Sequence, residues 1–144
     1  DAKLAYIAPS LGIRETRHFA GVTRLTRDTM YAEETRRAAI AQSAYNIDIH
    51  SGVKDHIDLT PVEEPFGIPY GCLVPERIDG LLLSGRTICV DTEVYASARV
   101  MGPCIAIGEA AGAAAAISID SGVEVRDVDV PTLQALLRKN GNLF

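Results

Sequence analysis

One ordered stretch, residues 81–116, constrains the fold of this chain more than any other. It begins with three consecutive leucines, passes through Ser84-Gly85-Arg86 and a loop, and ends in a segment rich in Gly and Ala. A short, fully apolar run is typical of a strand that is covered on both faces of a parallel sheet. The stretch therefore predicts a strand at residues 81–83 followed by a helix at residues 100–119. The same pattern also describes any tightly packed strand–helix unit that binds no ligand.

The ends of these two elements carry the features of a ligand site. Gly85 has no side chain and would let a ligand approach the backbone, and Arg86 places a positive charge at the carboxyl end of the strand. The helix is expected to begin near Met101, with Gly102 and Pro103 in its first turn. Its free amides and its dipole would favour an anion nearby.

Small residues continue along the predicted helix. Gly108, Gly112 and Ala116 recur at a spacing of four residues. Residues at that spacing share one face of a helix, so the row predicts a shallow groove. Another backbone or a flat ligand could lie in this groove more closely than large side chains permit.

The rest of the chain predicts an α/β arrangement in three parts. Residues 1–75 would form a substrate-side β region with one helix, residues 76–120 the strand–loop–helix unit, and residues 121–144 a terminal helix. Within these parts the residue patterns predict one strand at residues 11–25, a helix at 29–44, short strands at 46–50, 57–59 and 66–74, and a helix at 131–139.

Composition excludes several kinds of function. Fourteen basic residues against nineteen acidic ones give a net charge of −5, which argues against a nucleic-acid partner. Cys72, Cys89 and Cys104 lack the spacing of a metal site, so no metal is expected, and sparse thiols favour a cytoplasmic location. The longest apolar run is interrupted and falls short of the roughly 20 residues of a membrane span, so we expect none.

The order of these motifs resembles the FAD-dependent oxidoreductase family of the glutathione-reductase structural class. The resemblance covers nearly the whole chain. It rests on Leu-Leu-Leu-Ser-Gly-Arg, Ser-Ala-Arg-Val-Met and Gly-Glu-Ala-Ala-Gly, and on the upstream blocks Leu-Gly-Ile-Arg-Glu-Thr-Arg, Asp-Ile-His and Ile-Pro-Tyr. It implies a partial FAD-binding Rossmann-type domain, to which this chain contributes the closing strand and helix, beside a mixed β substrate-side region.

The resemblance also implies where the cofactor FAD would lie. Gly85 and Arg86 would lie near the pyrophosphate–ribityl arm. Apart from the resemblance, Asp91 lies in the loop before the predicted helix and could reach a ribityl or substrate hydroxyl. Residues nearer the helix start would lie close to the isoalloxazine, and the small residues would line the same helix. The residues near the isoalloxazine are Arg99, Val100, Met101 and Gly102. The small residues along the helix are Gly108 and Gly112.

Two residues are candidates for catalysis on a small-molecule substrate. His50 lies in the Asp-Ile-His block, and imidazole transfers protons near neutral pH; the alternative is a histidine at a strand end that meets solvent. Tyr70 could contact flavin or substrate through its hydroxyl, and the alternative is a half-buried strand tyrosine.

The chain departs from the family pattern in two ways. The Gly-x-Gly-x-x-Gly turn that seats the ADP pyrophosphate is absent, and Gly71 stands where members often carry Arg. We therefore expect a C-terminal fragment that needs the missing N-terminal part of the same protein and is inactive alone. Its exposed apolar faces would favour self-association. The alternative is a non-catalytic module that binds a small ligand or a subunit.

Overall fold

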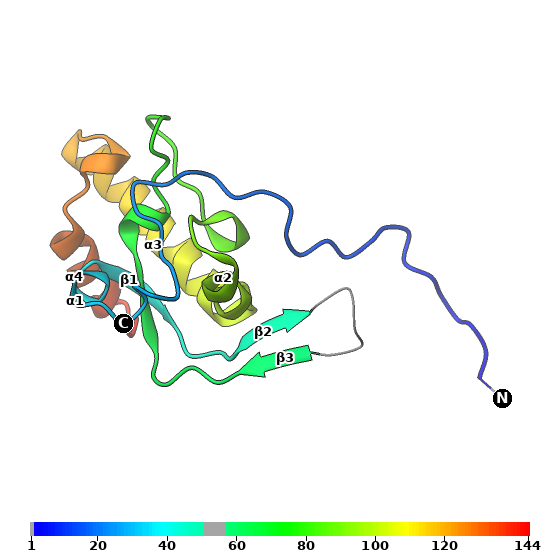
Figure 1. Cartoon of the computed structure of the whole chain (residues 1–144). Coiled ribbons are helices and arrows are strands. Elements are labelled where there is room, and N and C mark those ends of the chain that lie inside the picture. The colour runs from blue at the N-terminus through cyan, green and yellow to red at the C-terminus, as the bar shows by residue number, and fades with distance from the viewer. Residues whose placement is uncertain (1, 51–56) are drawn as a thin grey trace.

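The computed structural model describes residues 2–50 and 57–144 (Figure 1). Helices and small sheets are mixed, which confirms the α/β class at this coarse level. The α-helices are α1 (Glu33–Arg37), α2 (Thr92–Ala98), α3 (Met101–Ser121) and α4 (Val130–Lys139), and the strands are β1 (Ala39–Ser43), β2 (Ile47–His50), β3 (Ile57–Thr60) and β4 (Phe66–Pro69). Three 3-10 turns complete the set: η1 (Tyr70–Cys72), η2 (Gly85–Thr87) and η3 (Val125–Asp127).

The strands form two antiparallel pairs. β1 pairs with β4, with Ala41 opposite Ile68, and β2 pairs with β3, with His50 opposite Ile57. The β2–β3 hairpin projects from the body of the molecule (Figure 1). The short strands expected at residues 46–50 and 57–59 are thus confirmed.

One hydrophobic core runs through most of the chain. Strand β1 lies between β4 and the helices α3 and α4, and α2 packs on β2. Fully buried side chains come from distant parts of the sequence, including Leu25, Phe66, Ile107 and Leu137. The core therefore joins the β1–β4 pair to the C-terminal helices, and α2, whose Val94 and Tyr95 belong to the core, connects it to β2 of the candidate site.

The helix expected at residues 29–44 is confirmed only over its middle, because residues 29–32 lie outside any helix and the second half is not helical. The helix α1 ends at Arg37, and residues 39–43 form β1 instead. Alanine favours helices, but burial in a sheet overrides that local preference. The side chain of Gln134 also captures the carbonyl oxygens of Arg37 and Ala39, at 2.8 and 2.7 Å, where the chain turns from helix to strand.

The buried strand expected at residues 81–83 is also wrong. These leucines form no strand, and Leu81 is 36% exposed. Left-handed glycines at Gly80 and Gly85, with φ of +66° and +65°, turn the chain on either side of them. Within the described residues, no strand lies beside this segment to form a parallel ladder.

The strand expected at residues 66–74 is too long, and the strand expected at residues 11–25 is wrong. β4 ends at Pro69, and the chain continues as η1. Residues 11–20 form no regular element; the N-terminal segment runs out from the body as an extended, exposed trace (Figure 1). It joins the core at two isolated bridges, Gly21 with Pro75 and Leu25 with Val90.

Helix α3 starts where the sequence predicts, at Met101. By length and hydropathy it is also the one helix in the described residues that could cross a membrane, contrary to the expectation that no segment would qualify. Core helices of folded domains meet the same two criteria.

Candidate functional site

The candidate site lies where three segments meet: strand β2, helix α2 and the extended N-terminal segment. They enclose a pocket of about 250 Å³. Its lining residues are Arg14, Glu15, Asp48, Ile49, His50, Thr92, Tyr95, Ala96 and Arg99. Five of these side chains are ionisable Arg, Glu, Asp or His groups, so the pocket is suited to a polar ligand.

Three charged side chains form a cluster at one wall of this pocket. Asp48 and His50 stand two residues apart on β2 and therefore share a face of the strand. The Nε2 atom of His50 forms a hydrogen bond with Asp48 Oδ2 at 3.3 Å and an ion-pair contact with Oδ1 at 3.1 Å. Arg99, which follows the last residue of α2, donates from Nη2 to the Asp48 main-chain carbonyl at 2.8 Å and approaches Oδ2 at 3.4 Å.

The aromatic ring of Tyr95, which also lines the pocket, lies against this cluster. The Arg99 guanidinium lies 5.9 Å from the centre of the ring. The Tyr95 hydroxyl donates to the main-chain carbonyl of Arg14, which ties the extended N-terminal segment to α2. Burial, followed by the charge of Glu15, raises the pKa of Tyr95, so this hydroxyl keeps its proton at neutral pH.

The residues expected to face FAD lie near the main chain of Arg99, whereas its side chain reaches Asp48. Arg86, in η2, donates from Nε to the Arg99 main-chain carbonyl at 3.2 Å. Gly85 has a φ of +65°, which L side chains rarely adopt, so a glycine is required at this turn. The structure thus brings Gly85, Arg86 and Arg99 together with the start of α3.

Helix α3 begins without a side-chain cap. Val100 occupies the N-cap position, its side chain accepts no hydrogen bond, and Pro103 has no amide proton to satisfy. Met101 and Gly102 are exposed, and a side-chain carbon at Gly102 would meet nothing within 4 Å. The first two amides of the helix are therefore open to a ligand.

The remaining predicted cofactor residues are not part of this group. Gly108 and Gly112 lie on the same helix and are exposed, but Gly108 stands about 9 Å along the axis from Gly102 at the usual helical rise. Asp91 caps α2: its Oδ1 accepts from Val94 N at 2.8 Å, and its Oδ2 from Arg27 N at 2.7 Å. Both of its carboxylate oxygens therefore accept hydrogen bonds from the main chain.

Tyr70 lies apart from the pocket and inside the core. Its side chain is 3% exposed, and its hydroxyl donates to the Val125 carbonyl at 2.5 Å. Burial raises the pKa of Tyr70 to about 12. This environment matches the structural alternative for Tyr70; its contact with flavin or substrate stays a prediction.

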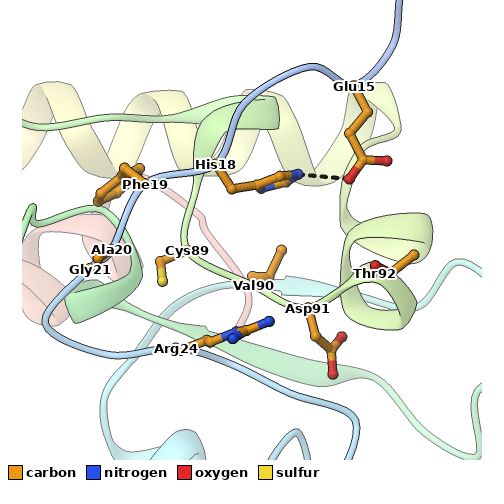
Figure 2. Close-up of a pocket in the computed structure, with 10 residues that line it drawn as sticks. All are labelled: Glu15, His18, Phe19, Ala20, Gly21, Arg24, Cys89, Val90, Asp91 and Thr92. Atoms are coloured by element: carbon orange, nitrogen blue, oxygen red, sulfur yellow. Dashed lines mark hydrogen bonds and ion pairs between the residues drawn. The ribbon is translucent and has the colours of Figure 1, made fainter.

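A second pocket of about 420 Å³ lies beside the first, at the start of α2 (Figure 2). His18 crosses it with both ring nitrogens in contact: Nδ1 with the Ile88 carbonyl at 3.2 Å and Nε2 with Glu15 at 2.8 Å. Arg24 and Asp91 lie on the opposite side (Figure 2). His18 anchors the extended segment to the body, a role that sequence reasoning missed because its carbonyl partner is 70 residues away.

Asp48 and Arg99 illustrate what the sequence showed and what it did not. Asp48 belongs to the Asp-Ile-His block, so the alternation of a strand could have placed it beside His50. Its contact with Arg99 spans 51 residues and has no local signal. No group of three or more His, Cys, Asp or Glu side chains able to hold a metal occurs within residues 2–50 and 57–144.

Comparison with known proteins gives one match. A family model described as FAD dependent oxidoreductase matches residues 1–137, which is nearly the whole chain. No curated protein and no solved structure matches it. The match covers the pocket, the start of α3 and most of α4.

Proposed function

The chain belongs to the FAD dependent oxidoreductase family, and from this premise we propose that it forms the C-terminal, flavin- and substrate-contacting part of such an enzyme. The cofactor of the family is FAD, which carries the redox chemistry when it is bound. The residues of this chain would supply position, charge and a proton-transferring group.

One observation carries the proposal: α3 opens with unused amides next to two arginines. The Met101 and Gly102 amides have no capping side chain, and Arg86 is held against the chain just before the helix. A helix N-terminus stabilises negative charge, and such charge gathers on the pyrimidine edge of a reduced flavin. The residues present therefore fit the cofactor that the family uses.

The neighbouring residues would extend the same contact. Gly85 and Arg86 would meet the pyrophosphate–ribityl arm, where a guanidinium can pair with phosphate. Gly108 and Gly112, with open space above them, would let the cofactor or a further backbone lie against α3. Asp91 would serve indirectly, by capping the helix that carries Arg99.

His50 would face the substrate. It lines the pocket with Arg14 and Arg99, and it lies within hydrogen-bond distance of Asp48. An imidazole in such a position can accept or return the proton that accompanies oxidation of an organic substrate. We therefore place proton transfer on the β2 side and flavin binding on the α3 side.

The chain lacks a Gly-x-Gly-x-x-Gly turn, and we propose that a Rossmann-type unit of the glutathione-reductase class supplies it from the same cytoplasmic protein. Without that turn, the ADP half of FAD has no helix N-terminus to bind. The chain by itself should then bind FAD weakly and show no activity.

The test is a visible spectrum of the protein produced together with its upstream coding sequence. A bound flavin should give visible bands that bleach with dithionite. Arg86→Ala removes a charged hydrogen-bond donor and should weaken FAD binding about tenfold or more. Arg126→Ala is the matched control, since Arg126 pairs with Asp79 instead, and it should leave the spectrum unchanged.

A folded but colourless protein would overturn the proposal. It would favour the second candidate, a binding module that uses the outer face of α3. That face exposes Met101, Ile105 and Ile119, which are 80%, 71% and 79% exposed, and such surface is typical of a contact site. In that case light scattering should show association through this face.

A further inference from the structure

We propose that Asp48 and Arg99 are positioning residues for His50: Asp48 fixes which ring nitrogen carries the proton, and Arg99 holds Asp48 in place. The role of His50 in a reaction rests on the proposed function, but its positioning by Asp48 and Arg99 does not. The arrangement itself rests on contacts between β2 and the residue that ends α2.

The first step concerns the tautomer of His50. A carboxylate only accepts hydrogen bonds, so the nitrogen that faces Asp48 must carry the proton. That nitrogen is Nε2, at 3.3 Å from Oδ2 and 3.1 Å from Oδ1. In the neutral ring, Nδ1 then keeps its lone pair, and it has no hydrogen-bond partner among the described residues. Asp48 thus prepares Nδ1 as the proton acceptor.

The second step concerns the position of Asp48. Its side chain is 17% exposed, and its Oδ1 is buried with no hydrogen bond, at 3.1 Å from His50 Nε2. A buried carboxylate needs a nearby positive charge. The Arg99 side chain, 11% exposed, supplies that charge at 3.4 Å from Oδ2.

The third step concerns the rigidity of Arg99. The same Nη2 atom reaches the main-chain carbonyl of Asp48 at 2.8 Å, which fixes the backbone as well as the carboxylate. The ring of Tyr95 supports the guanidinium from one side. The main-chain carbonyl of Arg99 accepts from Arg86. Arg99 therefore links the substrate-side histidine to the predicted flavin side.

Other charges in the pocket leave this arrangement intact. Glu15 forms its hydrogen bond with His18 Nε2 at 2.8 Å, and no contact joins it to His50 among the described residues. Arg14 lines the same pocket and is the group left to meet a polar substrate. Asp48 and His50 lie on one face of β2 because side chains two residues apart on a strand point to the same side.

The experiment is nitrogen NMR of the 144-residue chain labelled with ¹⁵N-histidine, at a pH where the imidazole is neutral. We expect His50 to occur as the Nε2–H tautomer, with a slowly exchanging Nε2 proton. Asp48→Ala should release that proton to fast exchange and give a mixture of tautomers. A main population of Nδ1–H in the unaltered chain would overturn the proposal, whether or not any variant folds.

Three variants sharpen the result. Asp48→Asn keeps an oxygen that can accept from Nε2 and should restore the fixed tautomer. Arg99→Ala should loosen it, although His50 and Asp48 are both unchanged. Asp79→Ala removes an aspartate from a different arginine pair, 2.6 Å from Arg126, and should have no effect on His50. Equal loss of the fixed tautomer in Asp79→Ala would mean a general structural effect and would contradict the proposal.

The measurement needs no flavin, so the two proposals fail separately. A fixed tautomer in a protein that never binds FAD would refute the proposed function alone. A bleaching flavin spectrum with a His50 ring that exchanges freely would refute the positioning role alone.

Discussion

Helices α3 and α4 pack in the same core but differ in how completely this chain surrounds them. α4 is capped by Asp129, whose carboxylate accepts from the Thr132 amide at 2.9 Å and from its hydroxyl. These hydrogen bonds, the hydroxyl's first, lower the pKa of Asp129. Leu133 and Leu137 are fully buried, and Arg138 and Lys139 occupy the last turn, where a positive charge suits the helix dipole.

Helix α3 lacks both the side-chain cap and the basic last turn of α4. Its inner face buries Ile107, Ala110 and Ala114, and its outer face exposes Met101 and Ile105. Its N-terminus has no side-chain cap. A helix that is apolar on both faces is normally buried on both. The comparison indicates that α4 is capped and packed within this chain, whereas the described residues leave one face and the N-terminus of α3 uncovered.

The largest expected effect separates the two faces of α3. Ile107→Ala removes a side chain with no exposed surface and should lower the free energy of unfolding by about 2–5 kcal/mol. Ile105→Ala, two residues earlier and 71% exposed, should change it by less than about 0.5 kcal/mol. Urea unfolding followed by circular dichroism measures both. Equal losses would mean that the outer face is already covered, as it would be in a self-associated chain.

A second change gives α3 the cap that α4 already has. Val100→Ser places a hydroxyl where it can accept from the Gly102 amide, and it should make the chain about 1 kcal/mol more stable than Val100→Ala. In the flavin-containing protein the same serine should weaken FAD binding, because it occupies an amide proposed for the cofactor. Thermal unfolding and a flavin titration measure the two effects. A more stable protein with unchanged flavin affinity would remove the α3 amides from the cofactor site.

The segment between the helices offers a third test. Tyr70→Phe leaves the Val125 carbonyl of η3 without its donor and should cost about 1 kcal/mol. The sign of the pH dependence follows from the raised pKa: the Tyr70 contribution is complete below pH 10 and is lost as the pH rises toward about 12.

Buried Cys72, with its pKa also raised to about 12, adds a loss over a similar range in both proteins. Between pH 9 and pH 12 the free energy of unfolding should therefore fall less steeply in Tyr70→Phe than in the unaltered chain. Identical slopes would show that the Tyr70 hydroxyl is not buried in solution.

Local signals predicted what depends on local chemistry. The start of α3 follows from Gly102 and Pro103, and α4 follows from Asp129 and Pro131. The strands β2 and β3 follow from alternation over a few residues. The helix α2 was missed although Asp91 is an N-cap residue followed by Glu93 in the first turn, so that signal was present in the sequence.

Long-range partners decided the rest. Ala39 and Ala41 favour a helix locally, but pairing with β4 and packing against α3 make them strand. The leucines at 81–83 are typical of a central strand, yet no neighbouring strand lies beside them within the described residues. For the site, His50 could be predicted from its sequence block, but the Arg99–Asp48 contact depends on how α2 packs on β2 and has no counterpart in the sequence around either residue.

The smallest expected effect compares two glycines on α3. Gly112 is exposed within the helix, and an added side-chain carbon there would meet nothing within 4 Å. Gly112→Ala should therefore raise the free energy of unfolding by about 0.5–1 kcal/mol. Gly122 ends the same helix at a φ of +65°, where alanine is strained, so Gly122→Ala should lower it by about 1 kcal/mol. The two alanines carry the same added methyl group, so their opposite signs isolate backbone conformation from side-chain size. If Gly112→Ala stabilises this chain yet weakens FAD binding in the flavin-containing protein, the outer face of α3 is reserved for close contact. If it stabilises the chain and leaves the affinity unchanged, the cofactor contact ends within the first turns of the helix.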